Sequence, residues 1–138
     1  MIKKVIWPGL LAGIAAMIAG FVVSMLMSRL FPSLAVQYET SGIFRPWTDP
    51  KMSIYFAYPF LLGLGLAYVW DKIKGVITGG VMKRALMLTL GCFVVSTVPG
   101  MTITYSSFTV SLLMVASWTV SGIVSVFCVG LVLAKMNG

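Results

Sequence analysis

Residues 85–134 read ALMLTLGCFVVSTVPGMTITYSSFTVSLLMVASWTVSGIVSVFCVGLVLA, and no charged side chain interrupts them. An α-helix needs about 20 predominantly apolar residues to cross the ~30 Å hydrocarbon layer of a bilayer. The stretch is therefore long enough for two membrane-spanning helices. The Pro99-Gly100 pair is expected to break or bend the first of them, so that residues 100–107 join the two spans. A re-entrant joint is the alternative.

The composition of the whole chain agrees with this interpretation. Its 138 residues are 59% hydrophobic and 9% charged, with a mean hydropathy of +1.03, whereas soluble domains carry about 25% charged residues. Two further uncharged runs, residues 5–28 and 52–70, are long enough to span a membrane. The first exceeds the ~7–15 apolar residues of a signal peptide, so it is expected to remain as a span. We therefore expect an all-α integral membrane protein.

Prolines and capping residues divide the chain into four expected helices. Pro8 suits a first helical turn, Thr48 or Asp49 before Pro50 suits the start of the second helix, and Pro59 predicts a kink within it. The expected single transmembrane domain, residues 1–138, has helices at about 5–30, 49–74, 81–98 and 107–134 and an ordered external loop at 32–48. Short connections make sequence neighbours antiparallel, which predicts an up-down-up-down bundle of four transmembrane helices.

The basic residues predict the orientation of this bundle. Seven of the ten Lys and Arg residues lie before the first helix, between the second and third helices, or after the fourth. The other three are Arg29, Arg45 and Lys51, on the opposite side. Because cytoplasmic loops carry the excess of Lys and Arg, both termini are expected in the cytoplasm and the protein in the plasma (inner) membrane. The net charge of +7 then reflects topology and contact with anionic lipid, not nucleic-acid binding.

Several classes of site lack the residues that they need. The chain has no histidine, and its two cysteines, Cys92 and Cys128, lie inside expected helices without a CxxC motif. Histidine-ligated haem, a histidine-based triad and a zinc motif are therefore excluded, and we expect no catalytic residues, cofactor or metal. The absence of ionisable side chains at hydrocarbon depth disfavours proton-coupled transport. The cysteines are interpreted as small hydrophobes, with a redox pair as the alternative.

Polar side chains gather in the external loop, which is the first candidate site. The cluster consists of Tyr38, Glu39, Arg45, Trp47 and Asp49, and it holds the only carboxylates expected on that face. Arg45 can pair with either carboxylate, and the aromatic side chains suit the membrane interface. The preferred interpretation is a cap over the outer mouth of the bundle. The alternatives are a recognition surface for a protein, lipid headgroup or small ligand, and catalysis by Glu39 and Asp49.

Small residues recur at every fourth position of the first and last helices. They form two ridges: Ala12, Ala16, Gly20 and Ser24 on the first helix, and Ser117, Ser121 and Ser125 on the last. Such ridges let helix backbones approach closely in lipid. They are interpreted as packing surfaces inside the monomer. A seam between identical copies and a hydroxyl-lined solute path are the alternatives.

The last two helices also carry many Ser and Thr residues, which leads to the functional hypotheses. Each hydroxyl can bond back to its own helix, or it can guide a polar solute. We expect a non-enzymatic accessory or structural membrane component, or a homo-oligomer, whose partners are the lipid bilayer and either a second copy or another membrane protein. A channel or facilitator for a small solute is the alternative, and an enzyme acting on lipid headgroups is the third hypothesis.

Overall fold

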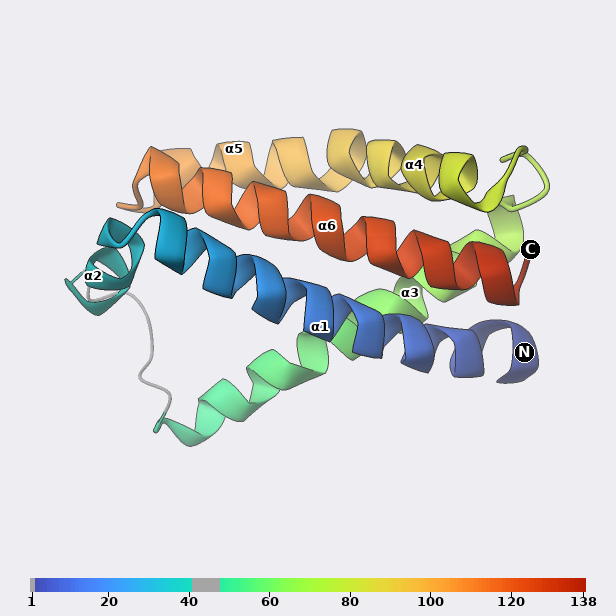
Figure 1. Ribbon diagram of the computed structural model, residues 1–138, viewed down its shortest axis with the longest axis horizontal. Helices are drawn as coiled ribbons and strands as arrows, with labels where there is room; N and C mark the ends of the chain where they lie inside the picture. Colours follow the sequence, from blue (N-terminus) through green and yellow to red (C-terminus); the bar gives the residue numbers. More distant parts are fainter. Residues whose placement is uncertain (1, 41–47) are drawn as a thin grey trace.

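The computed structural model describes residues 2–40 and 48–138, apart from the side chains of Ile2, Glu39 and Thr40. Every element in these ranges is helical (Figure 1). Three of them are π-helical or 3₁₀ segments, labelled η, that continue directly into an α-helix. In chain order the elements are η1 (Ile2–Ile6), α1 (Trp7–Leu30), α2 (Ser33–Thr40), η2 (Pro50–Ala57), α3 (Tyr58–Ile73), α4 (Val81–Cys92), η3 (Phe93–Thr97), α5 (Val98–Ser107) and α6 (Leu112–Met136).

Four continuous helical stretches in the described part of the chain are long and apolar enough to cross a membrane. They are Lys3–Leu30, Pro50–Ile73, Val81–Ser107 and Leu112–Met136, with mean hydropathies of 2.4, 1.5, 1.8 and 2.1. The expectation of an all-helical chain with four membrane-length helices is confirmed at this level.

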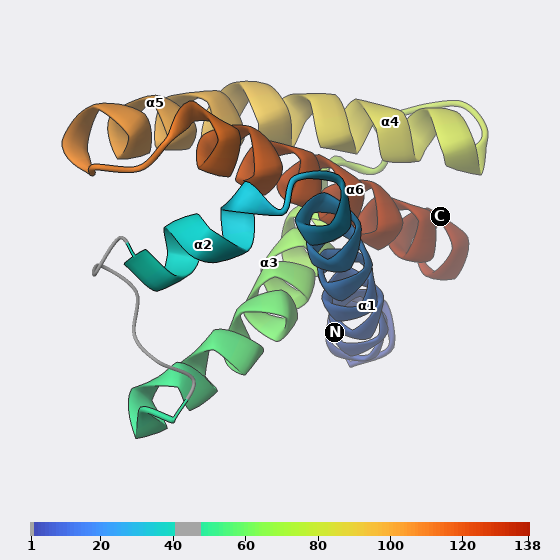
Figure 2. The same cartoon turned by 60° about the vertical axis from the view of Figure 1, so that its left-hand side comes forward.

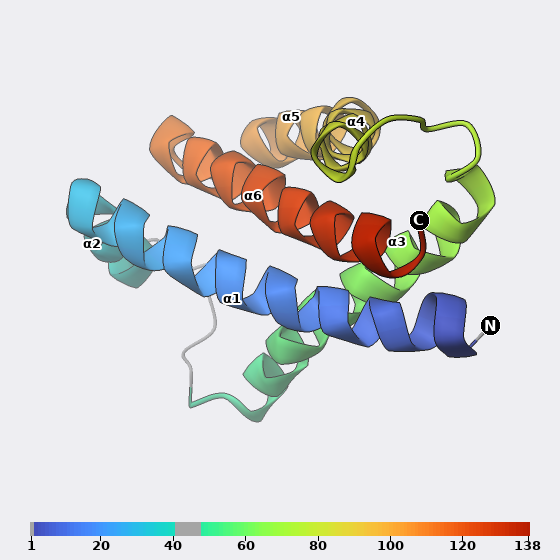
Figure 3. The ribbon, with the colours of Figure 1, turned by 45° about the vertical axis from the view of Figure 1, so that its right-hand side comes forward.

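Helix α6 lies at the centre of the arrangement. Helix α1 runs along one side of it, and α4, η3 and α5 form one long rod along the other (Figure 1). Helix α3 crosses α1 and then diverges, so that η2 stands away from the other helices (Figures 1 and 2). The start of α1, the α3–α4 connection and the end of α6 share one end of the molecule, here called the terminal end (Figure 3). Helix α2 and the α5–α6 connection share the opposite end, here called the loop end.

The main core fills the space where α1, α3, α4 and α6 meet. Trp70, Val129 and Leu133 are fully buried there, together with the small side chains of Ala12 and Ala67. These small residues let the helices approach one another, while the indole of Trp70 fills the space near the terminal end.

Three glycines bring α1 and α3 into direct backbone contact. Gly9 and Gly13, one turn apart on α1, face Gly63 on α3. A Cβ on Gly63 would lie 2.6 Å from the backbone nitrogen of Gly13, which is closer than such atoms can approach. A GxxxG spacing of this kind allows close helix crossing in lipid. The crossing is the point beyond which α3 diverges from α1.

The third membrane-length helix is longer than the sequence predicts. The expected end of this helix at residue 98 is wrong: of the break or bend expected at Pro99-Gly100, a break is not found, because the helix continues to Ser107. The π-helical turn η3 precedes Pro99 and closes with a hydrogen bond from the Val98 amide to the Phe93 carbonyl. This wider turn accommodates a proline, which has no amide hydrogen to donate and whose ring would crowd a regular helix.

The last helix therefore starts later than expected. Helix α6 begins at Leu112, not near residue 107, and residues 108–111 alone join it to α5. The Ser111 side chain caps it by accepting a hydrogen bond from the Met114 amide at 3.1 Å. A serine oxygen at this position satisfies one of the backbone donors that the first turn leaves unpaired.

The expected external loop also contains a helix. Residues Ser33–Thr40 form α2, and Leu34 within it is 1% exposed in a second, smaller core with Val110, Met114 and Val115. The second membrane-length helix begins as predicted: Asp49 is its N-cap, accepts from the Lys51 amide at 2.9 Å, and precedes Pro50. Pro59 lies in the first turn of α3, where the 3₁₀ segment changes to α-helix.

Candidate functional site

The external cluster is only partly described. Arg45 and Trp47 lie outside the described residues, and Glu39 belongs to α2 with its side chain outside them. Asp49 caps η2. The structure therefore does not test whether the carboxylates and Arg45 converge.

Tyr38 joins α2 to α6 at the loop end. Its hydroxyl accepts a hydrogen bond from Nε1 of Trp118 at 2.6 Å, and the two rings lie 6.4 Å apart. A second contact joins the same helices, because the Ser111 hydroxyl donates to Oε1 of Gln37. Burial raises the pKa of the Tyr38 phenol, and the hydrogen bond from Trp118 opposes this shift. Tyr38 thus secures α2 against α6, a contact that the sequence interpretation of a cap did not specify.

The two small-residue ridges fall on facing helices, α1 and α6. On α1, Ala12 and Ala16 are buried in the main core, whereas Ser24 is exposed. Gly20 faces α6, and a Cβ on it would lie 3.9 Å from the hydroxyl oxygen of Ser125. On α6, Ser117 and Ser125 are 7% and 8% exposed, and Ser121 between them is half-buried.

Two sets of hydroxyl groups on the last two membrane-length helices differ in their hydrogen bonding. In the first set, Thr89, Thr102, Thr104 and Thr119 each donate to the carbonyl four residues earlier, at 2.7–2.8 Å. In the second set, Ser117, Ser121 and Ser125 have no hydrogen-bond partner among residues 2–40 and 48–138. The first set is satisfied within its own helix. The second set keeps its hydrogen-bonding capacity.

A cleft lies between α1, α6 and the η2–α3 helix, in front of two of these serines. Its volume is about 70 Å³. Gly20, Ser121 and Ser125 form its small-residue side, and none of its described lining residues is charged. The remaining lining residues are apolar or aromatic: Ala16, Met17, Phe21, Tyr55, Phe56, Tyr58, Pro59 and Leu62. The rings of Phe21 and Phe56, 6.4 Å apart, meet across it.

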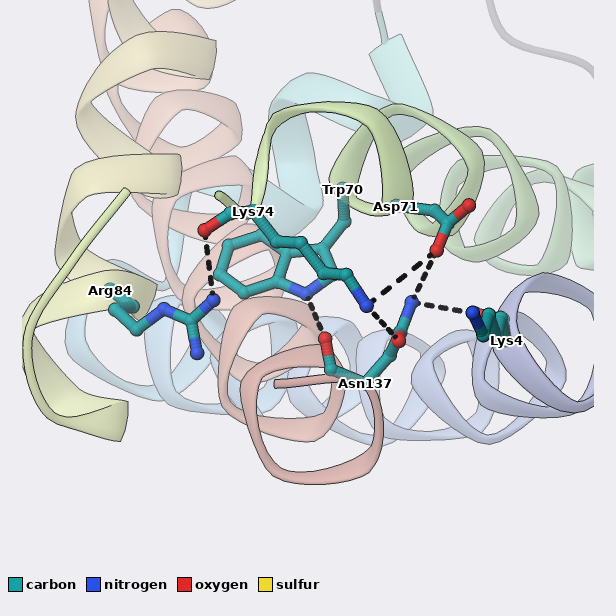
Figure 4. Close-up of polar contacts among 6 residues, drawn as sticks. All are labelled: Lys4, Trp70, Asp71, Lys74, Arg84 and Asn137. Carbon is teal, nitrogen blue, oxygen red and sulfur yellow. Dashed lines mark hydrogen bonds and ion pairs between the residues drawn. The ribbon is translucent and has the colours of Figure 1, made fainter. Parts of the chain in front are cut away.

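A polar cluster at the terminal end was not predicted from the sequence (Figure 4). We call it the Asn137 cluster; its members are Lys4, Trp70, Asp71, Lys74, Arg84 and Asn137. Nδ2 of Asn137 donates to the Lys4 carbonyl at 3.2 Å and to Oδ1 of Asp71 at 3.0 Å. Nζ of Lys74 donates to Oδ1 of Asn137 at 2.6 Å and lies 3.8 Å from Oδ1 of Asp71. One amide side chain therefore links α6 to both η1 and α3.

Trp70 and Arg84 complete this cluster. Nε1 of the fully buried Trp70 donates to the Asn137 carbonyl at 2.9 Å, and the Arg84 guanidinium lies 4.8 Å from the centre of its ring. Arg84 also donates to the carbonyls of Ile77 and Lys74, at 3.0 and 3.2 Å. These bonds satisfy backbone groups of the α3–α4 connection, where no helix can do so. The cluster therefore has a structural role: its hydrogen bonds hold the ends of η1, α3 and α6 together.

The described residues hold no group of three or more His, Cys, Asp or Glu side chains placed to bind a metal ion. Cys92 and Cys128 are both free thiols and half-buried. With one described carboxylate at each end of the molecule, Asp49 and Asp71, no described pair of acids is placed for acid–base chemistry.

Comparison with known proteins adds no family to this description. No protein-family model matches the chain, and no curated protein or solved structure matches it.

Proposed function

We propose that the chain is a non-enzymatic, multi-pass component of a membrane assembly that contains a second copy of itself. The single observation that carries this proposal is the divergence of the second membrane-length helix from the others, which leaves η2 standing away from them (Figure 2). η2 buries none of its residues, and 11% of the apolar part of Pro50–Ile73 is buried, the same share as in Val81–Ser107 but less than the 28% of Lys3–Leu30 and the 22% of Leu112–Met136. Phe56 contacts Phe21 of α1, but most of the outward surface of η2 and α3 has no described neighbour.

The outward face of this helix suits contact with another helix. Ala57, Leu61 and Gly65 recur at every fourth position and are exposed. Two of them, Ala57 and Gly65, are small, and a Cβ on Gly65 would meet nothing within 4 Å, so a neighbouring backbone can approach there. Small residues on a helix face favour association in lipid, where burial of apolar surface supplies no driving force. A two-fold contact would place the same face of both copies together.

The proposed orientation places the terminal end in the cytoplasm of a cell with an inner membrane. Its support is the basic charge of that end, where Lys4, Lys74 and Arg84 join the Asn137 cluster and Lys3, Lys72, Lys83 and Lys135 lie nearby in sequence. A reporter that is active only in the cytoplasm, fused after residue 138, is expected to be active. Activity of a periplasm-specific reporter at the same position would contradict this orientation.

Native mass spectrometry of the chain in lipid nanodiscs tests the assembly proposal. We expect a discrete homo-oligomer, and we expect Gly65→Leu to shift it to monomer because the larger side chain blocks close approach. Gly91→Leu is the matched control, because Gly91 is also exposed on α4 with nothing within 4 Å of a Cβ. A monomeric wild-type chain would contradict the proposal, and an equal response of both variants would remove η2–α3 as the contact.

The channel hypothesis receives less support. The hydroxyls of Thr102 and Thr104 on α5 each donate to a carbonyl of their own helix, so their hydrogens are already used within the helix. Of the α6 serines without a described partner, Ser121 and Ser125 line the cleft beside α1 and α3.

A further inference from the structure

The cleft between α1, α6 and η2–α3 holds buried hydrogen-bonding groups that the proposed assembly does not use. Ser125 is 8% exposed and lines the cleft together with Ser121. Neither hydroxyl has a hydrogen-bond partner in the described part of the chain, although Thr119 on the same helix bonds back to Val115 at 2.8 Å. A buried hydroxyl without a partner is unfavourable. The cleft therefore favours an occupant that supplies a hydrogen-bonding atom.

The lining restricts the charge of that occupant. No described lining residue carries a charge, and aromatic and aliphatic side chains form most of the walls. An ionised group would lose its hydration in such a cleft without gaining a counter-charge. The occupant is therefore neutral.

The depth of the cleft restricts the occupant further, given the membrane insertion proposed above. Ser121 and Ser125 lie near the middle of Leu112–Met136, and Gly20 lies in the central part of Lys3–Leu30. A phospholipid headgroup stays at the membrane surface and does not reach this level. A lipid-soluble molecule with a single oxygen does, and it can enter sideways past η2, which stands away from the other helices (Figure 2).

The size of the cleft favours a slender molecule. Its volume of about 70 Å³ is roughly half of the ~150 Å³ cavity that accepts a benzene ring. The end of a hydrocarbon chain with one oxygen fits such a space, and the rest of the chain can continue along the exposed side of η2.

We propose that this cleft binds the hydroxyl end of a single-chain lipid alcohol, either a straight-chain or an isoprenoid alcohol. The alcohol oxygen exchanges hydrogen bonds with Ser125 and Ser121, and Gly20 leaves room for it, since a Cβ there would lie 3.9 Å from the Ser125 hydroxyl oxygen. The aromatic side chains of Phe21, Phe56 and Tyr58 surround the first carbons of the chain.

Photolabelling of the full chain in lipid nanodiscs tests this proposal. The probe is octanol that carries a diazirine, and mass spectrometry locates the labelled residues. We expect label within residues 16–21, 55–62 or 121–125, with competition by unlabelled octanol or farnesol and little by octane. Ser125→Ala is expected to weaken octanol competition about three- to tenfold, which is the contribution of one neutral hydrogen bond.

Two further variants keep the test decisive. Gly20→Ala adds a methyl group at ordinary contact distance from Ser125, so it should narrow the cleft and reduce labelling while both hydroxyls remain. Ser117→Ala is the matched control, because Ser117 is also buried and without a described partner but does not line the cleft. It should leave labelling unchanged.

Three results would overturn the proposal. Equal competition by octane and octanol would mean that the cleft takes up any hydrocarbon, and label outside the three segments would mean that the cleft is not the site. An equal effect of Ser117→Ala and Ser125→Ala would show that the loss is not specific to the cleft. None of these results depends on the oligomeric state, so the proposed assembly is tested separately.

Discussion

The two ends of the molecule are held together in different ways. At the terminal end, Asn137, Asp71 and Lys74 form a network of directional hydrogen bonds around the buried Trp70. At the loop end, α2 rests against α6 through Leu34 and two polar contacts, and η2 stands apart with none of its residues buried. Most of the polar contacts between helices are thus at the terminal end, whereas at the other end η2 stands away from α1 and α2 (Figure 2).

This difference has a physical basis in where water is available. Polar groups at the terminal end lie at or just beyond the ends of the membrane-length helices, where Lys and Arg side chains can be placed at low cost because they can reach water. Along the apolar part of the spans, close packing of small residues takes over, as at Gly9, Gly13 and Gly63. The α1–α3 crossing is therefore the last firm contact before the two helices separate.

Removal of the indole at the terminal end should have the largest effect. Trp70→Ala deletes a fully buried side chain and leaves the Asn137 carbonyl without its donor. We expect a loss of about 3–5 kcal/mol in the free energy of unfolding, measured by denaturant titration in mixed micelles. Trp7→Ala, at a position 58% exposed, is the control and should cost under about 1 kcal/mol. Similar losses for both would show that burial in the terminal core does not matter.

A single methyl group added at the α1–α3 crossing should have the second-largest effect on the free energy of unfolding. Gly63→Ala forces a Cβ into the backbone of α1 and is expected to destabilise the protein by about 1–3 kcal/mol. Gly91→Ala is the control, because a Cβ on this exposed residue of α4 meets nothing within 4 Å, and it should be neutral or stabilise by up to about 1 kcal/mol. The same titration measures both variants, and effects of equal sign would contradict the close crossing.

Loss of the Asn137 side chain should increase hydrogen exchange at the terminal end without changing it at the loop end. Asn137→Ala removes the bonds to Lys4, Asp71 and Lys74 but keeps the carbonyl that accepts from Trp70. We expect a cost of about 1–3 kcal/mol and faster hydrogen exchange in η1 and residues 74–80, with α2 unchanged. Ser53→Ala, which removes a local exposed hydrogen bond to Pro50 in η2, is the control. Faster hydrogen exchange in α2 would contradict the conclusion that the contacts at the two ends stabilise the protein independently.

The smallest effect is expected at the loop end. Tyr38→Phe removes the acceptor for Trp118 and should cost about 0.5–1.5 kcal/mol. Because burial raises the pKa of Tyr38, the folded state favours the neutral phenol. The contribution of Tyr38 is then complete below its ordinary pKa of about 10 and is lost as the pH rises through the higher folded value. A difference titration of phenolate absorbance between wild type and Tyr38→Phe measures this, and a midpoint below 10 would contradict it.

The sequence was sufficient for the class of fold but not for its details. Uncharged runs and the Asp49-Pro50 cap predict four long helices and the start of the second, because length and capping are local properties. The continuation through Pro99 was missed because the wider turn of η3, which accommodates the proline, leaves no mark in the local sequence. Helix α2 was missed because its polar residues resemble a loop, although Leu34 anchors it to a core contributed by α6.

The polar cluster was missed for a different reason. Its members come from residues 4, 70–84 and 137, and they meet only because three helices end at the same place. Basic residues at helix ends were attributed to topology, and Asn137 was not considered. One sequence signal for the cluster was available: the large aromatic Trp70 directly precedes the carboxylate Asp71 at a helix end. The Gly9-Gly13 pair was a separate signal, because its spacing marks the close α1–α3 crossing.

The short uncharged connection between α5 and α6 has a consequence for how the chain enters the membrane during synthesis. Residues 108–111 can extend over about 14 Å at most, so these two helices cannot move far apart at any stage. In the orientation proposed above, they would insert as a pair, with the tip of the hairpin crossing first. Lys83 and Arg84 precede the pair and Lys135 ends it, which favours retention of both ends on the side of synthesis while the uncharged tip passes through.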